Sequence, residues 1–170
     1  MANKTLSSAA RTALLESLEL ELEPTPHFRE FKPRNISPDG MRELFLGVPE
    51  SVKVYARTLR DNGWRFYAVD QRRGYCLWAA KVITIPCWAI LAQTIPYKTW
   101  YISHEIAHAI ALQRDNCRGH GPDFMRALQE ICPPDCIHHE LGYKPRLAKA
   151  AGIVDPASSS PTDLFKLLEL

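Results

Sequence analysis

The chain lacks a disulfide framework. Its 170 residues include five cysteines, an odd number, and no two of them are spaced as C-x-x-C. Secreted domains that depend on disulfides carry paired cysteines, and zinc ribbons need two C-x-x-C pairs. Neither class fits, so we expect reduced thiols and a cytoplasmic protein.

The chain also lacks a long apolar segment and a strong excess of charge. Its longest apolar run, around residues 82–92, is interrupted by Thr84 and Pro86 and is too short to span a bilayer. Residues 1–11 lack the apolar stretch of a signal peptide. The net charge of +2 does not by itself indicate nucleic-acid or membrane binding. We expect a monomeric globular protein with no membrane partner.

Periodicity and proline content divide the chain into three parts. Residues 5–22 have the pattern of an amphipathic helix, and residues 21–38 contain four prolines, which is typical of an extended linker. We therefore expect an N-terminal helix and linker over residues 1–37. A folded domain should follow over residues 38–150, and residues 151–170 should form a flexible tail.

The central part mixes helical and strand patterns, which predicts the α+β class. Ser37 is a candidate N-cap for a helix that starts at Pro38. Strand signals follow a second helical segment, and residues 75–86 fit either one bent strand or two short ones. The segments expected to be regular are helices over 49–62, 99–112 and from Pro122 to about Ile131, and strands over 64–69, 75–79 and 81–86.

An H-E-x-x-H motif, formed by His104, Glu105 and His108, lies within the helix expected over residues 99–112. Residues four apart lie on one face of a helix, so the two histidines can bind one metal ion. His120 is the candidate third ligand, because Gly119 and Gly121 permit a sharp turn around it. Three protein ligands leave the fourth position open, which is how catalytic zinc differs from structural zinc.

This arrangement predicts peptide-bond hydrolysis without a covalent intermediate. A Zn²⁺ ion on three neutral histidines lowers the pKa of its bound water and polarises the scissile carbonyl. Glu105 would accept the proton of that water and later donate it to the leaving amine. A protein or peptide is the expected substrate.

The motif pair resembles the SprT-like family of zinc metallopeptidases. In that family H-E-x-x-H-A is followed by H-G-x-x-F or H-G-x-x-W, as in residues 104–109 and 120–124 here. The resemblance covers roughly residues 49–131 and implies a compact zincin-like fold, with a short β-meander packed on the active-site helix. It also implies that His104, His108 and His120 are the zinc ligands and Glu105 the base.

The resemblance carries two further implications. The strand near residues 81–86 would lie along the cleft and pair with an extended substrate, which is β-augmentation. Relatives in the family cleave proteins crosslinked to DNA, so DNA-associated proteins stay open as substrates and DNA as a partner.

Several alternatives stay open at this point. Glu140 could replace His120 as the third ligand. Asp115 or Asp123 could hydrogen-bond a ligand histidine. Tyr143 could stabilise the tetrahedral intermediate or simply pack in the core. Cys132 and Cys136, near His138 and His139, do not have the usual spacing of a second zinc site.

The tryptophans and the basic residues also allow two interpretations each. Core packing is the default for Trp64, Trp78 and Trp100, whereas Trp88 could lie at a cleft rim. The basic residues of the C-terminal half could bind DNA or be scattered surface charges. As a whole, the chain could be a zinc-stabilised module that binds peptide or DNA without proteolysis, or a regulator that cleaves one partner.

Overall fold

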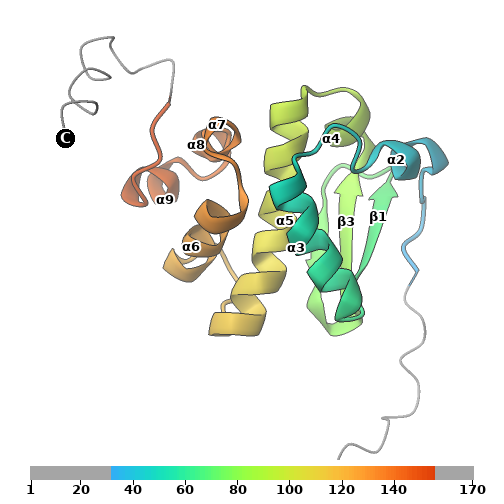
Figure 1. Ribbon diagram of the computed structural model, residues 1–170, viewed down its shortest axis with the longest axis horizontal. Helices are drawn as coiled ribbons and strands as arrows, with labels where there is room; N and C mark the ends of the chain where they lie inside the picture. Colours follow the sequence, from blue (N-terminus) through green and yellow to red (C-terminus); the bar gives the residue numbers. More distant parts are fainter. Residues whose placement is uncertain (1–31, 156–170) are drawn as a thin grey trace, which may run out of the picture. The chain divides into compact units, whose positions relative to one another are not determined.

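The computed structural model describes residues 32–155. The helix expected over residues 5–22, most of the linker and residues 156–170 of the expected tail lie outside the described residues. The described part belongs to the α+β class, as expected (Figure 1). Its elements are α2 (Pro38–Glu43), α3 (Glu50–Asp61), β1 (Arg65–Val69), β2 (Tyr75–Leu77), η1 (Trp78–Ala80), β3 (Val82–Pro86), α4 (Cys87–Leu91), α5 (Ile95–Asp115), α6 (Pro122–Ile131), α7 (Pro134–Ile137), α8 (Glu140–Tyr143) and α9 (Pro145–Ala150).

The three strands form one sheet in the order β1-β3-β2. β1 runs parallel to β3, with Arg65 opposite Val82 and Val69 opposite Pro86. β2 is antiparallel to β3. The expected β-meander is therefore wrong, because successive strands of a meander are antiparallel neighbours, whereas β3 lies between β1 and β2. Of the two readings of residues 75–86, two short strands are observed.

Burial explains why β3 is the central strand. All five of its residues are buried, and its apolar run is typical of a strand that is covered on both faces. β2 has three residues, none of them fully buried, and lies at the edge. Both edges of β3 are occupied by strands, so the expectation that this strand pairs with a substrate is also wrong.

Helix α5 passes through the middle of the domain, with the strands and α4 on one side and helices α6 to α9 on the other (Figure 1). The helix begins after Thr94, whose side chain accepts a hydrogen bond from the backbone N–H of Tyr97. It ends at Asn116, which has a left-handed φ of 52°. It is longer at both ends than the predicted segment. Its apolar residues Ile102 and Ile106 are fully buried.

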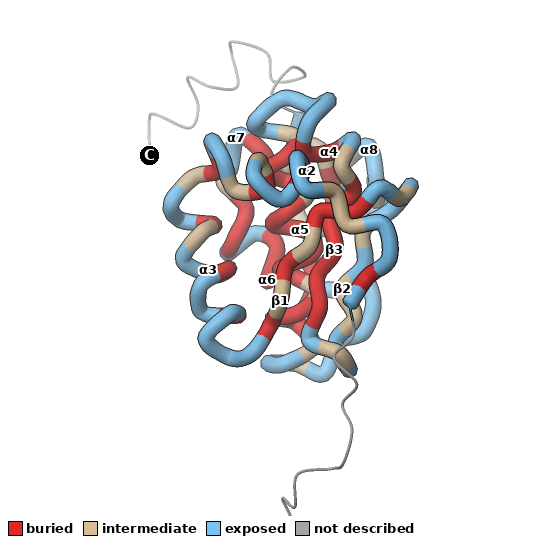
Figure 2. The backbone as a smooth tube through the Cα atoms, turned by 90° about the vertical axis from the view of Figure 1, so that its right-hand side faces the viewer, coloured by how far each residue is buried: buried red, intermediate tan, exposed pale blue. Residues whose placement is uncertain are grey.

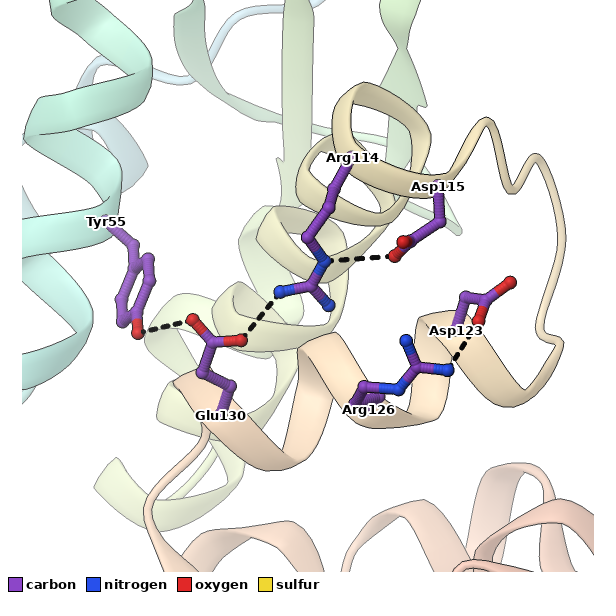
Figure 3. Close-up of polar contacts among 6 residues, drawn as sticks. All are labelled: Tyr55, Arg114, Asp115, Asp123, Arg126 and Glu130. Carbon is purple, nitrogen blue, oxygen red and sulfur yellow. Dashed lines mark hydrogen bonds and ion pairs between the residues drawn. The ribbon is translucent and has the colours of Figure 1, made fainter. Parts of the chain in front are cut away.

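The other helices predicted within residues 32–155 are observed. The Ser37 hydroxyl accepts a hydrogen bond from the backbone N–H of Gly40 at 3.1 Å, which confirms the predicted N-cap of α2. Glu130 of α6 links three helices at the surface. It accepts hydrogen bonds from Tyr55 of α3 at 3.1 Å and from Arg114 of α5 at 2.8 Å (Figure 3).

One hydrophobic core lies where α5 meets the sheet and α6 (Figure 2). Ile153, placed by the sequence in the C-terminal tail, is buried in this core. Ile36, placed in the linker, forms a bridge with Val69. The five cysteines are free thiols, as expected. Among residues 32–155, no helix is both long and apolar enough to cross a membrane.

Gly40 provides a test of this packing. A methyl group there would lie 2.8 Å from Cβ of Ala68 and 2.9 Å from Sγ of Cys87, both in closely packed elements. We expect Gly40→Ala to lower the free energy of unfolding by about 1–3 kcal/mol, measured by urea denaturation. In the control Gly142→Ala, the added methyl group has no atom within 4 Å and should not destabilise the fold. Equal urea midpoints for the two variants would contradict the packing described here.

Candidate metal centre

Three histidines converge at the C-terminal half of α5. His104 and His108 lie one turn apart on α5, and His120 lies in the loop before α6. One ring nitrogen of each lies within 4.8 Å of the others, and Nε2 of His104 is 3.0 Å from Nε2 of His120. Two nitrogens on one tetrahedral ion, each ~2.0–2.1 Å from it, would be about 3.3 Å apart. The cluster therefore could bind a metal ion.

The ring of Phe124 packs against all three imidazoles. Its ring centroid lies 4.9 Å from that of His104, 4.4 Å from that of His108 and 4.7 Å from that of His120. The side chain is fully buried on α6, so it fixes where the loop can place His120. The sequence showed Phe124 as part of a motif and of an apolar face, but not this contact.

The two glycines beside His120 do not provide the sharp turn that the sequence analysis expected of them. Neither Gly119 nor Gly121 has a positive φ, and a methyl group at Gly119 would have no atom within 4 Å. The turn begins instead at Asn116, whose left-handed conformation ends α5. The loop therefore does not depend on the conformational freedom of glycine at these two positions.

Glu140 does not have the position of a third ligand, which was the alternative that the sequence left open. It is fully buried on α8, and its Oε2 lies 3.0 Å from Nδ1 of His104 and accepts a hydrogen bond from Nε1 of Trp100 at 2.9 Å. A carboxylate on Nδ1 places the proton there and leaves Nε2 with its lone pair toward His120. Glu140 is outside the histidine cluster, so it orients a candidate ligand and does not replace His120.

The other oxygen of Glu140 supports a cation at this position. Among the described residues, Oε1 of Glu140 has no hydrogen-bond partner although it is buried. A buried carboxylate with so few donors is unfavourable unless positive charge lies nearby. A metal ion on the other nitrogen of His104 would supply that charge, so the donor set and its surroundings fit a bound cation.

Asp115 and Asp123 do not contact the histidines. Asp115 accepts a hydrogen bond from Arg114 at 3.0 Å, and Asp123 accepts one from Arg126 at 2.7 Å (Figure 3). Both therefore belong to surface ion pairs. A second metal site around Cys132 and Cys136 is not supported either, because the histidines form the one candidate cluster among the described residues.

Burial sets the protonation of the centre. It lowers the pKa of His108 to about 3 and that of His120 to about 4, and the charge of His104 adds to both effects. Both imidazoles therefore stay neutral near pH 7, which is the form that binds metals. Burial raises the pKa of Glu105 to about 7, opposed by the charge of His104 and assisted by that of Glu140. Glu105 can therefore gain or lose a proton near neutral pH.

Glu105 and Tyr143 both line two adjoining cavities. The first, of about 340 Å³, contains the three histidines and is bordered by β2, Trp78 and Arg118. The second, of about 400 Å³, is bordered by Trp88, Tyr97 and Tyr101.

Tyr143 is 51% exposed, which excludes the alternative that it packs in the core. Trp88 lies at a cleft rim as suggested, whereas the core placement of Trp78 is wrong, since it is 43% exposed.

Gly74 allows the turn before β2 to lie against Glu105. A methyl group at Gly74 would lie 2.5 Å from the carbonyl oxygen of Thr84 and 3.1 Å from Oε1 of Glu105. The backbone N–H of Gly74 also donates to the Tyr101 hydroxyl at 3.1 Å. These contacts fix the turn beside the carboxyl group, at the border that the two cavities share.

The role of Glu140 can be tested by metal affinity. We expect Glu140→Gln to weaken the binding of a probe ion such as Co²⁺ by about 10–100-fold, because the substituted amide no longer fixes the His104 tautomer. Affinity is measured by competition with a chromophoric chelator. Asp123→Asn, which alters a carboxylate beyond contact with the histidines, is the control and should bind as wild type does. Equal metal affinities of Glu140→Gln and Asp123→Asn would show that Glu140 does not influence metal binding.

The two depressed histidine pKa values predict acid sensitivity of the metal-free protein. The unfolded chain protonates His108 and His120 below about pH 6.5, whereas the folded chain does so only near pH 3 and 4. The free energy of unfolding should therefore fall as the pH decreases from 6.5 to 4. Glu105 acts in the opposite direction, because its folded pKa is raised from 4.5 to about 7.

Thermal unfolding in chelator at pH 7, 6 and 5 measures this effect. The double variant His108→Gln/His120→Gln removes the two histidine contributions and keeps that of Glu105. Its midpoint should therefore fall less with acid than that of the wild type. Parallel curves for the two proteins would show that these histidines are not neutral in the fold.

The comparisons with known proteins add no assignment. No family model matches the chain, and neither the curated proteins nor the solved structures contain a match. The function of the centre is therefore inferred from its own geometry and chemistry.

Proposed function

We propose that this protein is a zinc-dependent endopeptidase with a zincin-like, SprT-like catalytic centre. One observation carries the proposal. The cavity that contains the three converging histidines has a single carboxylate among its described lining residues, and that carboxylate is Glu105. A purely structural metal site does not need a carboxyl group that faces the cavity without being in the ligand cluster.

Zinc is the proposed ion because the donor set consists of three imidazoles with no thiolate in the cluster. Imidazole nitrogen suits several transition metals, and three histidines with an open position are typical of catalytic zinc. When bound, zinc supplies a Lewis acid that polarises the scissile carbonyl and makes water acidic enough to attack near neutral pH.

Glu105 is the proposed general base. Its pKa of about 7 suits proton transfer in both directions at neutral pH. It accepts a proton from the attacking water and returns it to the leaving amine. No hydrogen bond holds its carboxyl group among the described residues, so both oxygens can serve the substrate.

Tyr143 is the proposed donor to the negative oxygen of the tetrahedral intermediate. Its ring centroid lies 5.1 Å from that of His104 and 5.8 Å from that of His120. A hydroxyl on an exposed side chain that borders both cavities can reach a carbonyl held over the centre.

An extended peptide is the proposed substrate, and β2 is the strand that would bind it. Tyr75, Cys76 and Leu77 border the histidine cavity. β2 pairs with β3 on one side, and its other edge has no partner strand within residues 32–155. Backbone hydrogen bonds to this edge would align a peptide across Glu105, which is β-augmentation on a different strand from the one first expected.

The decisive variant is Glu105→Gln. We expect it to keep one zinc per chain, because Glu105 is not in the ligand cluster, and to lower kcat/KM by about 10²–10⁴. The assay is the cleavage of an unfolded protein by zinc-loaded enzyme, with and without single-stranded DNA. Glu130→Gln, a matched change in an exposed carboxyl group on α6, should cleave as wild type does.

The alternatives predict other results. A zinc-stabilised module that only binds peptide or DNA would cleave the unfolded protein under none of these conditions, although the wild type and both variants would contain normal amounts of zinc. A regulator with one partner would also leave a generic substrate intact, yet its own partner would be cut by the wild type alone. Cutting only with DNA present would make DNA-associated proteins the substrates. Equal cutting by the wild type and Glu105→Gln would remove Glu105 from the mechanism.

A further inference from the structure

The second cavity adjoins the metal centre directly. It shares Arg73, Gly74, Glu105 and Tyr143 with the histidine cavity. A residue of an extended chain advances by about 3.3 Å. A substrate held with its scissile bond beside Glu105 would therefore place the side chain of a nearby residue in this cavity.

The walls of the cavity are aromatic and already in place. The rings of Trp88 and Tyr101 pack edge to face with centroids 5.6 Å apart. The indole N–H of Trp88 donates to the carbonyl oxygen of Arg72 at 3.0 Å, and the Tyr101 hydroxyl accepts the N–H of Gly74. Both rings therefore anchor the turn that carries the two arginines, and no rearrangement is needed to form the pocket.

The charge around the cavity is positive. Arg72, Arg73 and Lys144 border it, and the two arginines are exposed. Within the described chain, none of these three cations forms an ion pair with an acidic side chain. Glu105 is the one acidic residue on the described lining, and it is buried. This positive charge therefore stays available to a ligand.

We propose that this pocket binds an acidic side chain of the peptide substrate, next to the scissile bond. The inference rests on the proposed peptidase function and names its substrate preference. Guanidinium groups bind carboxylates through paired hydrogen bonds, and the aromatic walls contact the methylene groups that precede the carboxylate. Glutamate, which has one methylene more than aspartate, makes more of this contact. A lysine side chain at the same position meets three like charges.

A peptide series tests the preference. Each peptide carries Glu, Gln, Ala or Lys at one position within two residues of the cleaved bond and is otherwise identical. The zinc-loaded full chain should cleave the Glu peptide with a kcat/KM about tenfold above that of the Gln peptide at one of these positions, and the Lys peptide more slowly still. Equal kcat/KM for Glu and Gln at every position would overturn the proposal.

Arg72→Glu tests the pocket itself. Arg72 borders the second cavity and not the histidine cavity. The variant should lose the preference for Glu over Gln and gain activity on the Lys peptide, while the kcat/KM of the Ala peptide changes less than that of the Glu peptide. Arg146→Glu makes the same charge change at an exposed position outside both cavities, and it should keep the preference. Equal shifts in both variants would indicate a general charge effect and overturn the proposal.

Peptide binding separates this proposal from the proposed function. If no peptide is cut, the proposed function fails, and the affinities of the same peptides are measured through the fluorescence of the exposed tryptophans. Tighter binding of the Glu peptide, lost in Arg72→Glu and kept in Arg146→Glu, still supports a pocket that binds an acidic side chain. Equal affinities overturn it. An oligothymidylate that displaces the bound Glu peptide at a concentration lower than that of the peptide would show that the pocket binds nucleic acid. This result would also overturn the proposal.

Discussion

The buried carboxylate of Glu140 links the C-terminal helices to the metal centre. Its two hydrogen bonds, to His104 and to Trp100, run from α8 to successive turns of α5. An unpartnered charge at this depth would be strongly unfavourable, so α8 must stay against α5 for the carboxylate to be satisfied. The same contact sets the tautomer of His104. The position of the C-terminal helices and the direction of a candidate metal ligand thus depend on one interaction.

Because of this contact, charge is distributed asymmetrically around the candidate metal centre. On the side of His104 that faces α8, a carboxylate oxygen remains without a described partner. On the opposite side, two further imidazoles stay neutral because burial disfavours their charged forms. Negative charge behind the ring and lone pairs in front of it produce a field that favours a cation between the histidines. The electrostatic surroundings of the three histidines therefore fit a bound cation.

Local signals made the histidine cluster and its helix predictable from the sequence. The four-residue spacing in α5 places His104 and His108 on one face, and the motif with Phe124 indicates that His120 returns to them. The contact of Glu140 with His104 could not be predicted in this way, because it joins positions 36 residues apart and the four-residue helix that carries Glu140 has no periodic signal. The strand order failed for another reason. The mostly apolar sequence of β3 is typical of a central strand, but the motif-based resemblance favoured a meander and outweighed it.

Acidic and basic groups lie at different depths in the cleft. The buried Glu105 lies beside the histidines, whereas Arg72, Arg73 and Lys144, which form no ion pair among the described residues, border the second cavity. Lys144 also acts on the centre, because its charge contributes to the lowered pKa values of His108 and His120. The charge that disfavours a proton on these histidines also opposes a metal ion. An acidic side chain beside Lys144 would weaken that opposition. Because such coupling is reciprocal, in the proposed peptidase a bound ion and an acidic substrate would each favour the other through this one lysine.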